Sequence, residues 1–284
     1  MNSKFNPAQK QIILVTDGPQ KKHSEVLISL QDRLRESGFE PKPTILEVPS
    51  EIIVKSSESY HKFDRVEFER SYSTLEKPID LELLMDYANK ANPSFSERIK
   101  QEVVSGSADI KEFLWKEYCF HFTGNAVHPI SLDLSIPTAI RKKNGPTHLL
   151  YVLFEHQLTS PRFIVFGELA YHMVGRGFSA LGTTGKIRTS DAQDERLIVV
   201  NMKALGNVSV EDKIIYAREI LNHEWEGHAI RGLKDHFGQN RDRNCIMHTK
   251  PTAEEYLQTG KKLNGRLYFC ESCTTESISL NKQI

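Results

Sequence analysis

The segment from His223 to His228 constrains this chain more than any other part of its sequence. It reads His-Glu-Trp-Glu-Gly-His, so two imidazoles stand five residues apart and Glu224 directly follows the first. With a spacing of four, both histidines lie on one face of a helix and bind one zinc ion, and the glutamate acts as general base. Five residues on a regular α-helix put the two side chains roughly 140° apart, too far to share an ion. The sequence therefore predicts a zinc site on the condition that a π-bulge realigns them.

The composition is that of an ordinary globular protein. The chain has 284 residues, of which 39% are hydrophobic and 26% charged, enough for one large domain or two modest ones. Lys plus Arg and Asp plus Glu both number 37, and a net charge of zero argues against general affinity for nucleic acid or membrane. No apolar run approaches the roughly 20 residues of a membrane span, and residues 1–11 lack the apolar h-region of a signal peptide, so we expect neither.

Four cysteines, two of them spaced Cys270-x-x-Cys273, fit a reducing compartment in which thiols bind metal more readily than they form structural disulfides. Together with the absence of a span or signal peptide, this leads us to expect a cytoplasmic protein.

The pattern of apolar residues is typical of an α/β fold. We expect helices at about 22–37 and 79–104, the latter broken near Pro93, and strands at about 11–17, 44–54, 149–154, 163–166 and 196–202. The glycine-punctuated stretch 177–187 is expected to hold an edge strand. A helix that begins near residue 210, with Ser209 as its cap, is expected to carry the histidines.

Two segments lack a clear period. Residues 55–78 are charged and aromatic, and we expect a surface excursion there. In residues 108–146, four aromatic residues (Trp115, Tyr118, Phe120 and Phe122) indicate burial, whereas the prolines and a Lys-Lys-Asn-Gly-Pro run indicate a loop between subdomains. A loop within residues 108–146 would separate an N-terminal α/β region of unknown role, residues 1–146, from a C-terminal domain, residues 147–284, that contains the histidine motif.

The order of strands, long helix and cysteine-bearing region resembles the archaemetzincins, a cytosolic branch of the metzincin zinc peptidases. The family pattern is H-E-x-x-H-x-x-G-x-x-H-C, then C-x-M, then C-x-x-C, and the resemblance covers about residues 147–275. The matching positions are His223, Glu224, His228, Gly232, His236, Cys245-Ile246-Met247, Cys270 and Cys273. Each of the three steps from the first histidine to the last is one residue longer here, and Phe237 stands where a cysteine should follow. The hexapeptide alone is similar to that of dipeptidyl peptidase III, where the longer spacing binds zinc and a distant glutamate is the third ligand.

The resemblance implies a metzincin-like mixed sheet, an active-site helix and a C-terminal zinc-binding subdomain. It implies that His223, His228 and His236 bind a catalytic zinc ion and that Glu224 is the general base for hydrolysis of peptide bonds. Met247 would lie beneath this site in a packing role.

A second, structural zinc ion is implied at Cys245, Cys270 and Cys273, since closed structural sites have four ligands. Phe237 replaces the fourth ligand of the family pattern. His248 is the nearest substitute in sequence, and Cys119 is a further choice.

The expected partner is a peptide or protein substrate, which would add as a strand to residues 177–187. A competing interpretation is a non-catalytic, zinc-stabilised binding protein in which the lengthened motif has lost the catalytic geometry. A third is a hydrolase that acts on a non-peptide amide. Tyr256 and Tyr268 follow the methionine, and their spacing assigns a transition-state role to neither.

Overall fold

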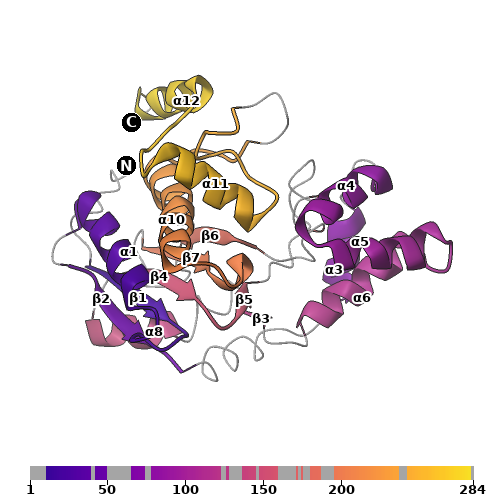
Figure 1. Ribbon diagram of the computed structural model, residues 1–284, viewed down its shortest axis with the longest axis horizontal. Helices are drawn as coiled ribbons and strands as arrows, with labels where there is room; N and C mark the ends of the chain where they lie inside the picture. The colour runs from indigo at the N-terminus through magenta and orange to yellow at the C-terminus, as the bar shows by residue number, and fades with distance from the viewer. Residues whose placement is uncertain are drawn as a thin grey trace.

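The computed structural model describes residues 11–39, 42–49, 65–73, 78–122, 126–127, 136–144, 147–158, 171, 174, 180–186, 195–236 and 242–282. These residues form a five-stranded sheet of order β2-β1-β4-β7-β6 (Figure 1). Its strands are β1 (Gln11–Thr16), β2 (Thr44–Glu47), β4 (Thr147–Leu153), β6 (Gly182–Lys186) and β7 (Arg196–Asn201). The first four in the sheet order are parallel, and β6 runs antiparallel to β7 at the edge. The expected α/β class and edge strand are confirmed.

The central strands are apolar on both faces because helices cover both. Along β4, Leu150 and Val152 belong to one buried cluster, whereas Leu149 and Tyr151 belong to another. The first cluster packs against α1 (Ser24–Glu36), α10 (Val210–Leu221) and α11 (Ala253–Leu263), and the second includes Ile140 of α8 (Ile136–Asn144). A strand buried on both faces has a continuous apolar run, which is why the predictions for β1, β4 and β7 are confirmed.

A group of helices between β2 and β3 has its own core and lies beside the sheet in Figure 1. It comprises α3 (Arg65–Ser73), α4 (Leu81–Ala91), α5 (Pro93–Ile99), the π-helical η2 (Lys100–Val104) and α6 (Ile110–Phe122). Asn92 caps α5 and Pro93 is its first residue, so the expected break is confirmed. The surface excursion expected over 55–78 contains a helix, α3. Of the two alternatives for 108–146, a loop is wrong at α6 and α8, and burial is right for Trp115, which packs against the core of this group. Apolar side chains of α3 and α6 pack in this separate core, and their spacing in the sequence does not show the regular period of a helix that packs on a sheet.

The expected domain boundary at residue 146 separates two strands that pair with each other in one sheet. Strand β1 pairs with β4 from Gln11 opposite Thr147 to Thr16 opposite Val152, so segments from both sides of residue 146 form one structure. The strand expected at 163–166 lies outside the described residues, as do residues 50–64 of the N-terminal region. The remaining elements are β3 (Ala126–Val127), β5 (Gln157–Leu158), η3 (Lys203–Leu205), η4 (Asn222–Ile230) and α12 (Glu271–Lys282). Within the described ranges, every helix is too short or too polar to cross a membrane.

Candidate metal centres

The helix that carries the histidines changes its hydrogen-bond register where the motif begins. Helix α10 continues into η4, a π-helix of nine residues. A π-helix bonds residue i to residue i+5, so side chains five apart lie on the same face. The Nε2 atoms of His223 and His228 are accordingly 3.2 Å apart. The geometric condition that the sequence imposes is met, by a whole π-helical segment in place of a single bulge.

Asp235 is the third side chain at this position, which we call the helix site (His223, His228 and Asp235). Its Oδ1 lies 3.1 Å from Nε2 of His223 and 3.4 Å from Nε2 of His228. Tetrahedral zinc with ligand bonds of about 2.0–2.1 Å separates its ligand atoms by about 3.3 Å. The three atoms therefore fit one face of a zinc coordination sphere. His236, which the sequence analysis expects here, lies at a different site.

Backbone carbonyls orient both imidazoles. Nδ1 of His223 lies 2.7 Å from the carbonyl oxygen of Ile246, and Nδ1 of His228 lies 2.8 Å from that of Leu233. An Nδ1–H that donates to a carbonyl leaves the Nε2 lone pair available to a cation.

The ionisation of the helix site favours a positive charge. Burial lowers the pKa of His228, but the hydrogen bond with Asp235 and the charge of Glu224 raise this pKa to about 9. Burial raises the pKa of Asp235, but hydrogen bonds from His223 and His228 hold it well below its usual range. The negative charge of Asp235 thus favours a positive charge at His228, and a metal ion bound there would replace the proton.

Two glycines and a methionine shape the helix site. Gly232 has φ 66°, and its N–H donates to the carbonyl of His228, so the chain turns away directly after the helix. A Cβ on Gly227 would stand only 2.0 Å from Sδ of Met247. The buried methionine therefore packs against the backbone of η4 between the two histidines, consistent with a packing role beneath the site.

The side chain of Glu224, a residue of η4, packs against the edge strand β6. Its side chain is buried, and a Cβ on Gly182, the first residue of β6, would stand 2.9 Å from its Oε1. The same Cβ would stand 2.6 Å from Cγ2 of Ile220, so the strand backbone passes over the carboxylate with no room for a side chain. Burial raises the pKa of Glu224, and the two nearby histidines partly offset this rise. A carboxylate of this kind beside metal-binding groups can accept a proton from water.

A second group, the cysteine site, consists of His236, Cys245, Cys270 and Cys273, whose ligand atoms all lie within 4.8 Å of one another. Nε2 of His236 is 3.3 Å from Sγ of Cys245 and 3.6 Å from Sγ of Cys270, and the sulfurs of Cys245 and Cys273 are 3.7 Å apart. Bonds of about 2.3 Å to tetrahedral zinc place two sulfurs about 3.8 Å apart. This group could therefore hold a metal ion.

The histidine at the cysteine site is His236, where the sequence analysis expects His248. The ring of His248 lies 5.8 Å from that of His236, outside the group. The other alternative, Cys119, lies on α6 in the helical group, away from the three cysteines.

An extended segment explains why two adjacent residues serve different sites. His236 bridges to His248, donates its N–H to the carbonyl of Met247 and accepts a hydrogen bond from the N–H of Thr249. Successive side chains of an extended chain point in opposite directions. Asp235 therefore faces the helix site, where Oγ1 of Thr249 donates to it at 2.9 Å, and His236 faces the cysteines.

The two tyrosines lie in different surroundings. Tyr256 on α11 is buried, with its ring perpendicular to that of His223 at a centroid distance of 5.9 Å. Tyr268 is exposed and donates to Asp242 at 2.6 Å. Tyr256 therefore supports the imidazole of His223 from within the core, and Tyr268 binds a carboxylate outside both metal groups.

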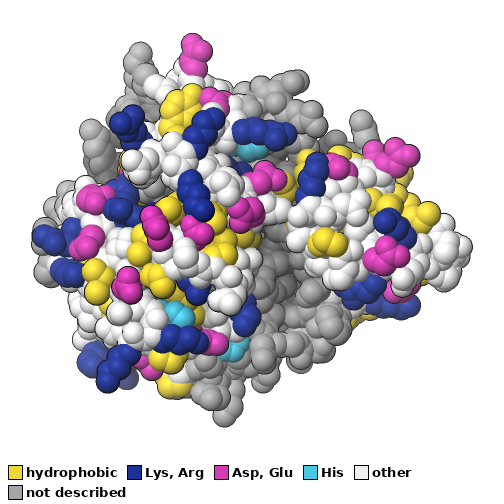
Figure 2. Space-filling model, in the orientation of Figure 1, with side chains coloured by type: hydrophobic (Ala, Val, Ile, Leu, Met, Phe, Trp, Pro, Cys, Tyr) yellow, Lys and Arg dark blue, Asp and Glu magenta, His cyan; other side chains and the backbone are white. Residues whose placement is uncertain are grey.

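The described residues thus contain two adjacent groups with metal-ligand geometry, joined by the peptide bond between Asp235 and His236. Charged side chains of both signs are interspersed on the visible surface (Figure 2), in keeping with the zero net charge. Comparison of the chain with protein-family models, with curated proteins and with solved structures finds no match.

Proposed function

We propose that this protein is a zinc-dependent peptidase of the archaemetzincin-like type. The observation that carries the proposal is the triangle of His223, His228 and Asp235, with sides of 3.1, 3.2 and 3.4 Å, next to the buried carboxylate of Glu224. Metal ligands, a candidate base and an edge strand converge on one position, as hydrolysis of an extended peptide requires.

The position of Asp235 brings the chain closer to the archaemetzincin pattern. Asp235-His236 then stands where that pattern has His-Cys, so the first residue supplies the third catalytic ligand and the second supplies a structural ligand. With Asp235 as the third ligand, the spacing from Gly232 to that ligand is three residues, as in the family pattern. Only two spacings are then one residue longer than in the pattern: His223 to His228 and His228 to Gly232. The π-helical winding of η4 accommodates the longer spacing between the two histidines.

The residues of the helix site have distinct roles in the proposed reaction. His223, His228 and Asp235 would hold a zinc ion, which would supply a Lewis acid that lowers the pKa of water and polarises a peptide carbonyl. Glu224 accepts a proton from the attacking water and passes it to the leaving amine nitrogen. Its burial keeps bulk solvent away from this proton. A zinc ion at the cysteine site would have a structural role, because the four side chains there could supply all four ligands of a closed site.

The edge strand is the proposed binding surface for the substrate. β6 ends the sheet of the described residues, and its backbone passes over Glu224 at Gly182. A peptide that adds to this edge would bring its backbone carbonyls toward the helix site. A cavity of ≈ 550 Å³ adjoins the start of β6; residues from the end of α4, from η3 and from the start of α11 line it, with Leu181 next to Gly182. We propose that part of the substrate lies there.

The test is cleavage of a peptide library by the zinc-loaded full chain, followed by mass spectrometry with and without a zinc chelator. Chelator-sensitive cleavage supports the proposal. Zinc bound at both sites without cleavage of peptides or of acylated small amides would favour a non-catalytic zinc-stabilised binding protein. Cleavage of the small amides alone would favour a hydrolase of non-peptide amides.

Gly182→Ala is expected to lower kcat for peptide cleavage by about tenfold to a hundredfold, because a misplaced catalytic group can cost that much. The added methyl group must displace Glu224 or Ile220. Zinc content should stay unchanged, since Gly182 touches neither metal group. The matched control is Thr183→Ala, on the opposite face of the same strand. Equal kcat values for the two variants would contradict the proposed position of Glu224.

A further inference from the structure

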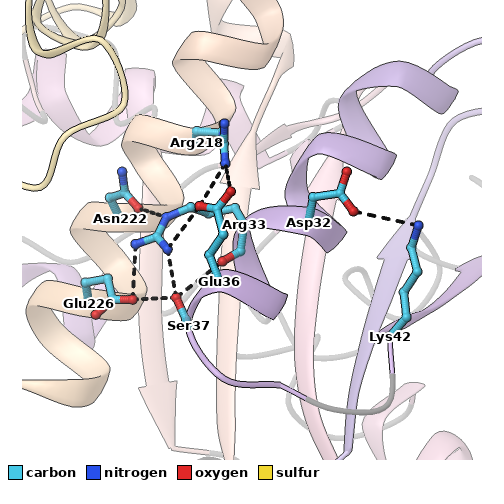
Figure 3. A network of polar contacts seen from close by, with 8 residues as sticks. All are labelled: Asp32, Arg33, Glu36, Ser37, Lys42, Arg218, Asn222 and Glu226. Carbon is cyan, nitrogen blue, oxygen red and sulfur yellow. Dashed lines mark hydrogen bonds and ion pairs between the residues drawn. The ribbon is translucent and has the colours of Figure 1, made fainter.

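Arg33 of α1 contacts the π-helical segment on the side that packs against α1 (Figure 3). Its Nε donates to Oδ1 of Asn222 at 2.7 Å, and its Nη2 donates to Oε1 of Glu226 at 3.2 Å. Ser37 donates to the same Glu226 oxygen at 2.5 Å and accepts a hydrogen bond from Arg33 Nη1 at 3.0 Å. Arg33 is only 7% exposed, so these bonds lie largely out of water. One buried cation thus binds two points of η4.

The two contact points lie on either side of His223, and both precede His228. Asn222 is the first residue of η4 and directly precedes His223, and Glu226 lies two residues before His228. π-Helical segments are rare, and unusual backbone geometry persists where surrounding contacts over-determine it. The guanidinium is a planar fork with fixed spacing between its donors. It therefore fixes how far Asn222 and Glu226 lie apart along the helix.

We propose that Arg33 is a positioning residue that holds η4 in its π register and thereby keeps Nε2 of His223 and Nε2 of His228 close enough to share one ion. This inference rests on the proposed function, because it takes the helix site to bind metal. Arg33 contacts neither metal group and acts through Asn222 and Glu226. In an α-helical register the two imidazoles would diverge by roughly 140° and the site would open.

Arg218 offers a matched control within the same network. It lies on α10, one turn before Asn222, and its Nη2 donates to both carboxylate oxygens of Glu36 at 2.9 and 3.0 Å. It thus ties α1 to α10, whereas Arg33 ties α1 to η4. Arg218→Met removes the same charge and the same kind of bond without altering the contacts of Arg33 with Asn222 and Glu226.

The experiment is titration of the metal-free full chain with Co²⁺, followed by visible and near-ultraviolet absorption. Thiolate-to-cobalt charge transfer reports the cysteine site, and the ligand-field absorption that is lost in the His223→Ala/His228→Ala variant reports the helix site. Arg33→Met is expected to lower the Co²⁺ affinity of the helix site by about tenfold to a hundredfold, the usual effect of losing a residue that supports metal ligands. The affinity of the cysteine site should not change. Arg33→Lys should fall between Arg33→Met and the unaltered chain, because an ammonium is a point charge that can satisfy one of the two partners.

Three results separate the possible failures. Unchanged helix-site affinity in Arg33→Met would overturn the inference. Equal losses at both sites, or an equal loss in Arg218→Met, would mean general destabilisation and would also overturn it. Failure of the unaltered chain to bind Co²⁺ at the helix site would instead defeat the proposed function. If Arg33→Met does not fold, as the charge-transfer band would reveal, the comparison of Arg33→Lys with Arg218→Met decides the matter.

Discussion

Asp235→Ala is expected to release one of two bound zinc ions and to abolish peptide cleavage, whereas His236→Ala is expected to release the other ion. The two side chains are adjacent in the chain but face different groups. Asp235 Oδ1 lies 3.1 Å from Nε2 of His223, and Nε2 of His236 lies 3.3 Å from Sγ of Cys245. Loss of one of three or four protein ligands removes much of the affinity of a zinc site.

Elemental analysis gives zinc per chain, which should fall from about two to about one in each variant. Co²⁺ spectra then tell which site is lost, because the cysteine site alone gives thiolate charge transfer. Lys234→Ala, at the exposed neighbour of Asp235, is the control and should keep both ions. Asp235→His restores the residue of the archaemetzincin pattern and should retain metal at the helix site. Loss of the helix-site ion in His236→Ala, with Asp235→Ala unaffected, would contradict the ligand sets derived from the structure.

Glu224→Gln is expected to lower kcat for peptide cleavage by about 10²- to 10⁴-fold with both zinc ions retained. The amide has the shape of the carboxylic acid and fits the same buried position, but it does not accept a proton from water. Because Glu224 is not a member of either metal group, metal affinity should change little. The measurement pairs kcat with zinc content on the same preparation.

The matched control is Glu219→Gln. Glu219 is also buried, one helical turn before His223, and belongs to neither metal group. Its replacement removes a buried carboxylate from the same helix and should leave kcat much closer to that of the unaltered chain. Full activity in zinc-loaded Glu224→Gln would rule out Glu224 as the base. Similar losses in both variants would show that any buried charge on this helix produces the effect.

The sheet was accessible to sequence reasoning because its central strands are buried on both faces. Their uninterrupted apolar runs and the alternation between two cores leave few other conformations for β1, β4 and β7. The helix from Val210 was equally visible, because Ser209 caps it and two acidic residues occupy its first turn. Local patterns of this kind act over a few residues and need no knowledge of the partner elements.

The helical group was less accessible. Trp115 and three further aromatic residues at 118, 120 and 122 indicate burial, but their spacing matches no single helical face. Helix α6 packs in a core that α3, α4 and α5 also build, so its apolar positions depend on several neighbours at once. The sequence also did not show that residues on both sides of position 146 share one sheet. The pairing of β1 with β4 joins residues more than a hundred positions apart, and no local pattern reports such a contact.

The residue types at the candidate metal centres were visible in the sequence alone: two histidines and a glutamate in one segment, then a glycine, a methionine and three cysteines. Tertiary structure decided how they divide into two sites. We propose that contacts from outside the helix, those of Arg33 among them, hold the π register that aligns His223 with His228. Asp235 and not His236 is the third member of the helix site because His236 pairs with Met247 and Thr249, and an extended chain turns neighbouring side chains to opposite sides. The spacing of three residues from Gly232 to Asp235 was visible in the sequence. Only the structure shows that the chain turns at Gly232 and brings Asp235 to His223 and His228.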